Sequence, residues 1–95
     1  MNEYLNQSLV YLHSEDLTKA NQEIESAQQL WEHAGKLING YVNHEIIDTV
    51  EENLVRLNAH IKAQQIQQAK VIVKAIQFEL NHLYECELPS LKNIF

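Results

Sequence analysis

The nitrogen and sulfur side chains that invite a metal-binding hypothesis are five histidines and one cysteine: His13, His33, His44, His60, His82 and Cys86. Zinc is held by about four converging nitrogen, sulfur or oxygen ligands. His82 and Cys86 lie four residues apart and so share one face of a helix, but no second pair with such spacing is visible. We expect no metal site and no cofactor, and we keep a metal-binding helical bundle that uses His82 and Cys86 as an alternative.

A second group of polar residues combines one histidine with three acids: His44, Glu45, Asp48 and Glu52. The acids follow the spacing i, i+3 and i+7, which forms a stripe near the start of a helix. Acidic side chains stabilise a helix N-terminus by about 0.3–1 kcal/mol each, so a structural role is sufficient to explain them. The alternative is a surface that binds a partner, and these four residues are the first candidates for it.

Trp31 is the fifth candidate for partner binding. It stands among Ala27, Ala34 and Gly35, and a large ring among small neighbours is typical of packing in a helical core. The alternative is an aromatic floor in a groove that receives a partner helix.

Catalytic signatures are not found in the sequence. It contains no Gly-x-Ser-x-Gly elbow, and Cys86 has no basic neighbour to lower the pKa of its thiol. The two glycines, Gly35 and Gly40, cannot form a phosphate-binding loop. We therefore expect that the protein is not an enzyme.

The distribution of charge points to a protein partner rather than a nucleic acid. The formal net charge is −6, whereas nucleic-acid binding relies on Lys and Arg. Residues 1–52 carry ten acidic and two basic residues, and residues 53–95 carry three acidic and five basic ones. One hypothesis is that the acidic side of the domain binds a basic protein. The alternative is that the acids only keep the domain soluble.

Apolar residues recur with steps of three and four, which is the period of an amphipathic helix rather than of a strand. The chain has 95 residues with two glycines and one proline, so it predicts one all-α domain with long helices. We expect an antiparallel four-helix bundle built from two helical hairpins, with a C-terminal tail packed back onto it. The helices are predicted at about 2–13, 16–38, 44–61 and 65–87, and the tail at 88–95.

Several residues mark the ends of these helices. Ser14 or Asp16 can cap the second helix, and the Asn-Gly pair at 39–40 can end it. The join at 62–65 has no helix breaker, and Pro89 ends the fourth helix.

The two halves of the chain also match each other at an offset of 49 residues, which pairs Leu5 with Leu54 and Trp31 with Leu80. Because 49 is a multiple of seven, heptad spacing alone produces part of this match, and a duplication remains open.

Residues 17–95 are similar to an uncharacterised bacterial domain-of-unknown-function family, number forty-three sixty-three. The resemblance is carried by Trp31, Val42–Ile46, Leu54–Leu57, His82–Tyr84 and Leu88–Phe95. Members of that family commonly begin with one hydrophobic segment, which serves as a signal or membrane anchor. No such segment opens this sequence, and no stretch reaches the roughly 18–20 apolar residues of a membrane span.

The resemblance implies a membrane-anchored, extracytoplasmic domain if an N-terminal segment has been removed, and a cytoplasmic one otherwise. The leading hypothesis is a non-catalytic helical module that binds an unknown protein partner by a groove or its acidic side. The alternatives are the metal-binding bundle and a self-assembling structural protein.

Overall fold

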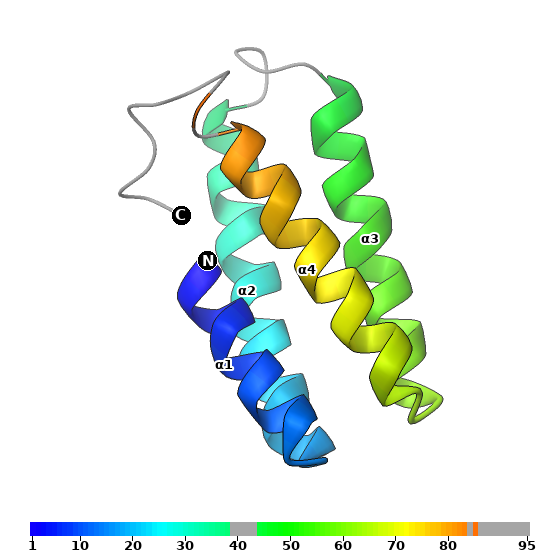
Figure 1. The fold of residues 1–95 in the computed structure, drawn as a ribbon. Coiled ribbons are helices and arrows are strands. Elements are labelled where there is room, and N and C mark those ends of the chain that lie inside the picture. Colours follow the sequence, from blue (N-terminus) through cyan, green and yellow to red (C-terminus); the bar gives the residue numbers. More distant parts are fainter. Residues whose placement is uncertain (39–43, 84, 86–95) are drawn as a thin grey trace.

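The computed structural model describes residues 1–38, 44–83 and 85, and only the backbone at 37 and 38. It contains four helices: α1 (Asn2–His13), α2 (Leu17–Ile38), α3 (His44–Lys62) and α4 (Ile66–His82). Two antiparallel hairpins, α1–α2 and α3–α4, lie side by side in one bundle, in which α1 also packs against α4 (Figure 1). The predicted all-α four-helix bundle is confirmed. The Asn-Gly pair, Cys86, Pro89 and the tail at 88–95 lie outside the described residues.

The predicted helix bounds differ from the observed ones by one residue at three ends, while α4 is described to His82 and its predicted end at 87 lies outside the described residues. The second helix begins at Leu17 because Asp16 caps it, and the Asp16 Oδ1 accepts a hydrogen bond from the Lys19 N–H at 3.1 Å. Ser14, the other candidate cap, instead donates its hydroxyl to the Val10 carbonyl at 2.8 Å. The third helix ends at 62 and the fourth begins at 66.

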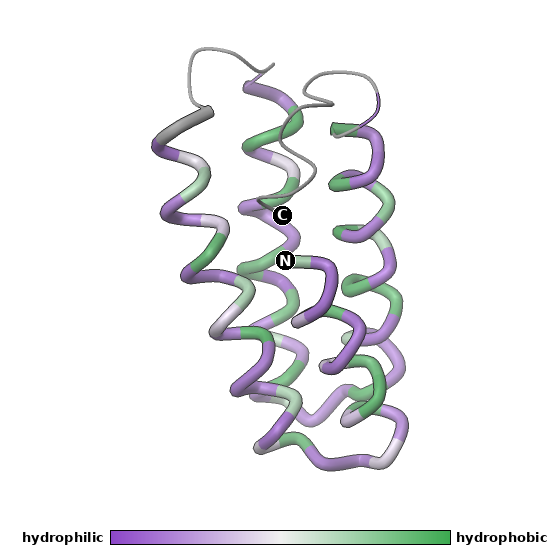
Figure 2. Tube along the Cα trace, turned by 90° about the vertical axis from the view of Figure 1, so that its left-hand side faces the viewer, coloured by the Kyte–Doolittle hydropathy of each residue, from purple (hydrophilic) through white to green (hydrophobic). Residues whose placement is uncertain are grey.

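One apolar face of each helix forms the core. Figure 2 shows hydrophobic and hydrophilic residues alternating with the helical period along each helix. A fully buried Leu, Ile, Val or Phe side chain contributes about 1.5–3 kcal/mol relative to an exposed one, so this shared core is the main stabilising term. The largest fully buried apolar side chains come from all four helices: Leu5, Leu12, Ile24, Trp31, Val50, Leu57, Val73, Ile76, Leu80 and Leu83.

The turns that close the two hairpins have the same backbone hydrogen bonds. Each contains one residue in the left-handed region, Glu15 with φ 63° and Gln64 with φ 59°. In each turn the next residue donates its N–H to the carbonyl five positions back, at 2.8 Å in the first turn and 2.9 Å in the second. This is the Schellman arrangement at a helix C-terminus. The two turns are 49 residues apart, so the offset seen in the sequence is also an offset in structure.

Polar contacts join the first hairpin to the second. The Gln77 side-chain amide donates to the Asn6 Oδ1 at 2.7 Å, and Asn2 donates to Asn81 at 3.5 Å. Both contacts lie between α1 and α4, which fixes these two helices against each other.

Candidate functional site

Helices α2 and α3 make the sparsest contact of the neighbouring helix pairs, and hollows lie between them. A central hollow of about 460 Å³ shares Trp31, Glu32 and Glu51 with a smaller one of about 200 Å³. The smaller hollow shares Gln28 with a third, of about 530 Å³, which extends to Gln64 in the second turn. The three hollows follow one another between α2 and α3 and share lining residues, and together we call them the α2–α3 groove.

The floor of the α2–α3 groove is apolar. Trp31 is 2% exposed and packs in the core, as its small neighbours predicted, while its side chain also lines two of the hollows. Ile47 and Leu54 of α3 complete the floor, and both are buried. Val55 stands at the edge of the groove and is 68% exposed, so it adds apolar surface beside the floor.

Carboxylates dominate the rim of the groove. Glu32 comes from α2, and Asp48 and Glu51 come from α3, and all three are exposed. In the part of the chain that the structure describes, the ion pairs are Lys19–Asp16 and Arg56–Glu52, so none of the three is held in a salt bridge. Lys36 also lines the central hollow, which leaves a net negative charge around the apolar floor.

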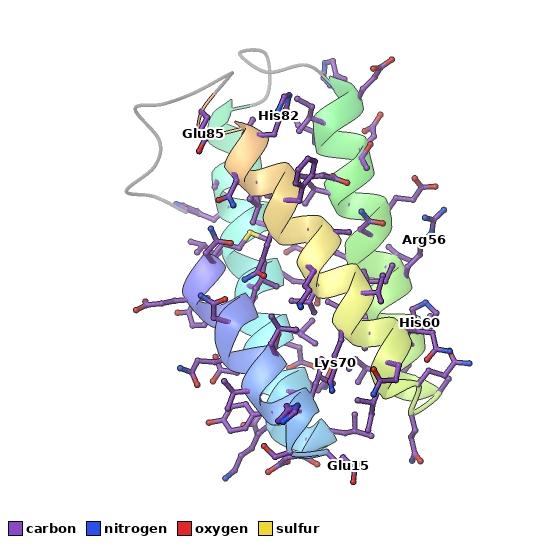
Figure 3. All side chains as sticks on the ribbon, viewed as in Figure 1. Glu15, Arg56, His60, Lys70, His82 and Glu85 are labelled. Carbon is purple, nitrogen blue, oxygen red and sulfur yellow. The ribbon has the colours of Figure 1, made fainter. Side chains whose placement is uncertain are left out.

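The five candidate residues for partner binding lie in three different places. Trp31, His44 and Asp48 line the central hollow together, and His44 is the first residue of α3. Glu45 instead lines a pocket between α3 and α4. Glu52 lines neither of them: it is exposed and pairs with Arg56, four residues on along α3, at 3.6 Å. Figure 3 shows Arg56 on the outer side of α3, away from the neighbouring helices.

The groove residues that the sequence reasoning did not select include Glu32, Glu51 and Val55. A signal was present for two of them, because Glu51 and Val55 follow Asp48 with the spacing i, i+3 and i+7 on one side of α3. That side lies between the core face and the outer face. Whether this side of α3 forms part of a groove depends on which helix packs beside it, and the amphipathic pattern of one helix does not show this.

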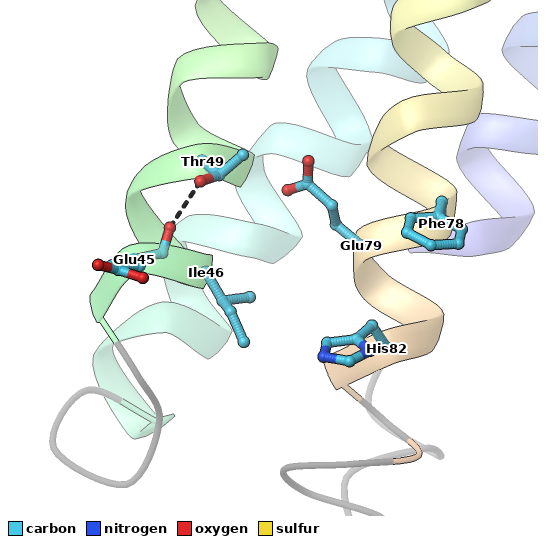
Figure 4. Close-up of a pocket in the computed structure, with 6 residues that line it drawn as sticks. All are labelled: Glu45, Ile46, Thr49, Phe78, Glu79 and His82. Carbon is cyan, nitrogen blue, oxygen red and sulfur yellow. Dashed lines mark hydrogen bonds between the residues drawn. The ribbon is translucent and has the colours of Figure 1, made fainter.

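The second site with notable geometry is a pocket of about 390 Å³ between α3 and α4, which we call the α3–α4 pocket. Its described lining consists of Glu45, Ile46, Thr49, Phe78, Glu79 and His82 (Figure 4). The Thr49 hydroxyl donates to the Glu45 carbonyl at 2.6 Å, so that hydroxyl is used within the helix.

Glu79 is the polar group of this pocket that is withdrawn from water. Its Oε1 accepts a hydrogen bond from the Asn53 side-chain amide at 3.2 Å, and Asn53 is only 7% exposed. Burial raises the pKa of the Glu79 carboxyl above its usual value, and the hydrogen bond from Asn53 opposes this only in part. The other oxygen, Oε2, is buried and has no hydrogen-bond partner among the described residues.

Within the described residues, no three His, Cys, Asp or Glu side chains are placed to share a metal ion. His82 lines the α3–α4 pocket, and Cys86 lies outside the described residues, so the alternative that pairs them stays a prediction. The search for a membrane-crossing helix, over the same residues, finds none that is long and apolar enough.

Comparison with known proteins places the chain in a family without defining its activity. Residues 1–94 match a family model described as a domain of unknown function, DUF4363. No curated protein and no solved structure matches the chain.

Proposed function

The chain belongs to the DUF4363 family of domains of unknown function, and for it we propose a non-catalytic role as a protein-interaction module. The ligand is a basic amphipathic helix, which binds in the α2–α3 groove. The observation that carries this proposal is the combination in one groove of an apolar floor and a rim of carboxylates that have no basic partner within the chain's described residues.

The groove has the properties that helix recognition requires. Helix-in-groove binding places apolar side chains at i, i+3, i+4 and i+7 on a hydrophobic floor, here Trp31, Ile47 and Leu54. Lys or Arg on the flanks of such a helix would then face Glu32 and Glu51, one from each wall. Complementary charge of this kind selects the partner and accelerates association more than it adds affinity.

Trp31 makes the proposal directly measurable, because it is the single tryptophan of the chain and lies under the groove. The test titrates the protein with an 18-residue peptide that has Leu on one helical face and Lys on the other. We expect a saturable change in tryptophan fluorescence that weakens as salt is added. A matched peptide with Glu in place of Lys should not bind.

Variants place the binding in the groove. The double substitution Glu32→Gln and Glu51→Gln should weaken binding of the basic peptide about two- to thirtyfold, since each exposed ion pair is worth about 0.2–1 kcal/mol. Glu85→Gln, an exposed acid on the chain segment after α4, serves as the control and should leave the affinity unchanged. Equal affinity of the basic and acidic peptides, or of the double variant and the wild type, would remove the proposal.

The location of the domain is a separate proposal, which follows from the family resemblance: a membrane tether N-terminal to it, on the extracytoplasmic side. Fractionation and external protease, applied to cells that express the full-length gene with a C-terminal tag, test it. Membrane pelleting with a protease-sensitive tag supports the tether, and a soluble, protected tag rejects it.

A further inference from the structure

The α3–α4 pocket contains an inversion of the amphipathic pattern that the first hairpin does not have. At the offset of 49 residues, Phe78 and Glu79 of α4 correspond to Gln29 and Leu30 of α2. In α2 the polar residue is exposed and the apolar one is half-buried, as a bundle requires. In α4 the order is reversed: Phe78 is 74% exposed, and the Glu79 carboxylate is half-buried.

This reversal costs stability, and nothing inside the described fold compensates it fully. A carboxylate withdrawn from water needs hydrogen bonds or an opposite charge. Glu79 has one donor, Asn53 at 3.2 Å, while its Oε2 is buried without a partner among the described residues. Asn53 is itself a buried polar residue, and the corresponding residue of α1 is Tyr4. Positions at which a sequence breaks the local rules of its own fold are expected to be functional or strained, so this one is a place to look for a ligand.

The pocket beside Glu79 has room for a ligand, but its described lining contains no Lys or Arg to pair with the carboxylate. Its volume of about 390 Å³ lies within the range of about 300–1,000 Å³ that small-ligand sites occupy. Ile46 and Phe78 form apolar walls on the two helices, and Glu45 adds a second acid (Figure 4).

We propose that the α3–α4 pocket is a binding site for an organic cation that has an ammonium or guanidinium head on an apolar stem. The Glu79 carboxylate pairs with the head, and Asn53 holds the carboxylate in place from the core side. Ile46 and Phe78 contact the stem, and the exposed face of the Phe78 ring attracts the cation. Two sources carry this chemistry, a free amine and a Lys or Arg side chain of another protein.

Titration of the ¹⁵N-labelled full chain, followed by NMR, tests the site. The probes are hexylammonium, the tripeptide acetyl-Gly-Lys-Gly-amide and the neutral analogue hexan-1-ol. We expect saturable shift changes within residues 45–49 and 78–82 for a cation, and at least tenfold weaker effects for hexan-1-ol. Binding of hexylammonium alone assigns the site to free amines, and binding of the tripeptide assigns it to side chains. Binding of neither cation, or equal binding of hexan-1-ol, overturns the proposal.

Substitutions distinguish a role of Glu79 in binding the cation from a role in stabilising the fold. Glu79→Gln keeps the shape and an acceptor for Asn53, so the fold should remain intact while hexylammonium binds at least tenfold more weakly. The exposed acid Glu3 of α1 provides the matched control, and Glu3→Gln should change nothing. Unchanged affinity in Glu79→Gln would contradict the assignment even if the pocket binds the probe.

A swap to the pattern of the first hairpin gives a second readout. The double variant Phe78→Gln and Glu79→Leu should have a higher Tm than the wild type and no hexylammonium binding, because it restores the normal amphipathic order. A lower Tm would show that the inversion stabilises the fold, and the inference would fail. Tryptophan fluorescence keeps this result distinct from the α2–α3 groove, because Trp31 does not line the α3–α4 pocket.

Discussion

The two hairpins of the bundle have matching turns and matching core positions although their sequences differ. Their turns share one set of backbone hydrogen bonds at an offset of 49 residues, and each turn places a non-glycine residue in the left-handed region. Their core positions also match, so Trp31 of α2 and Leu80 of α4 are both buried at corresponding places. The hairpins differ at the sides of their helices, where α3 and α4 carry Asn53 and the inverted pair at 78 and 79.

This difference shows which features a hairpin requires in order to fold and which features it can lack. A buried apolar stripe and a closed turn are sufficient for a hairpin, and both hairpins have them. A half-buried carboxylate beside an exposed phenylalanine is not required, since the first hairpin folds with Gln29 and Leu30 at those places. The second hairpin therefore carries the features that packing does not explain.

The largest effects are expected where the hairpins agree, in the shared core. Trp31→Ala should lower the free energy of unfolding by about 3–5 kcal/mol and Leu80→Ala by about 2–5 kcal/mol, because each leaves a cavity. Both variants should unfold in one transition, since the core contains residues of all four helices. Urea denaturation followed by circular dichroism measures this, with the exposed Val71→Ala as a control that changes little. Two separate transitions would show that the hairpins unfold independently.

A smaller effect is expected where the two turns differ. Asp16 caps α2 through its side chain, whereas Gln65, the corresponding residue before α4, makes no side-chain cap hydrogen bond. Asp16→Ala should cost about 0.5–2 kcal/mol. Gln65→Asp should stabilise the protein by less than about 1 kcal/mol, because the new cap replaces the exposed hydrogen bond between the Gln65 Oε1 and the His60 Nδ1 at 2.7 Å. Thermal unfolding checks both, and Gln65→Asn tests whether a neutral cap gives the same gain. A destabilised Gln65→Asp would mean that the two turns are not equivalent in detail.

The sequence was sufficient to predict the architecture because the spacing of the apolar residues identifies the helices and the short segments between them mark the turns. The steps of three and four residues gave the number of helices, and their ends fell within one residue at 13, 16, 61 and 65. The second turn was harder, since Gln64 adopts a positive φ that glycine or asparagine usually supplies. Its match to the turn at Glu15 was the available signal.

The candidate site was predicted only in part, because a groove depends on how far apart two helices stand. Trp31, His44 and Asp48 line one hollow together. Glu45 lines a different pocket, and Glu52 pairs with Arg56. A spacing of i, i+3 and i+7 spans an arc of only about 60° around a helix. The acids at the two edges of this arc, Glu45 and Asp48, nevertheless line different hollows, one beside α4 and one beside α2. The sequence gives no distance between α2 and α3, and so it could not select Glu51 over Glu52.

The last and smallest expected effect is a pH dependence that arises at Glu79 of the second hairpin. Burial raises the pKa of Glu79 above 4.5, so the folded state favours the protonated carboxyl. A raised pKa in the folded state contributes stability below the unfolded value, and this contribution is lost as the pH rises through the folded value. The Tm of Glu79→Gln relative to wild type should therefore increase as the pH rises from about 4 toward 7. Thermal scans over this range measure the difference, and Leu30→Gln in the first hairpin should give a constant one because it removes no titrating group. A difference for Glu79→Gln that is flat or falls with pH would mean that the carboxylate is fully compensated in the fold, and the contrast between the two hairpins at this position would disappear.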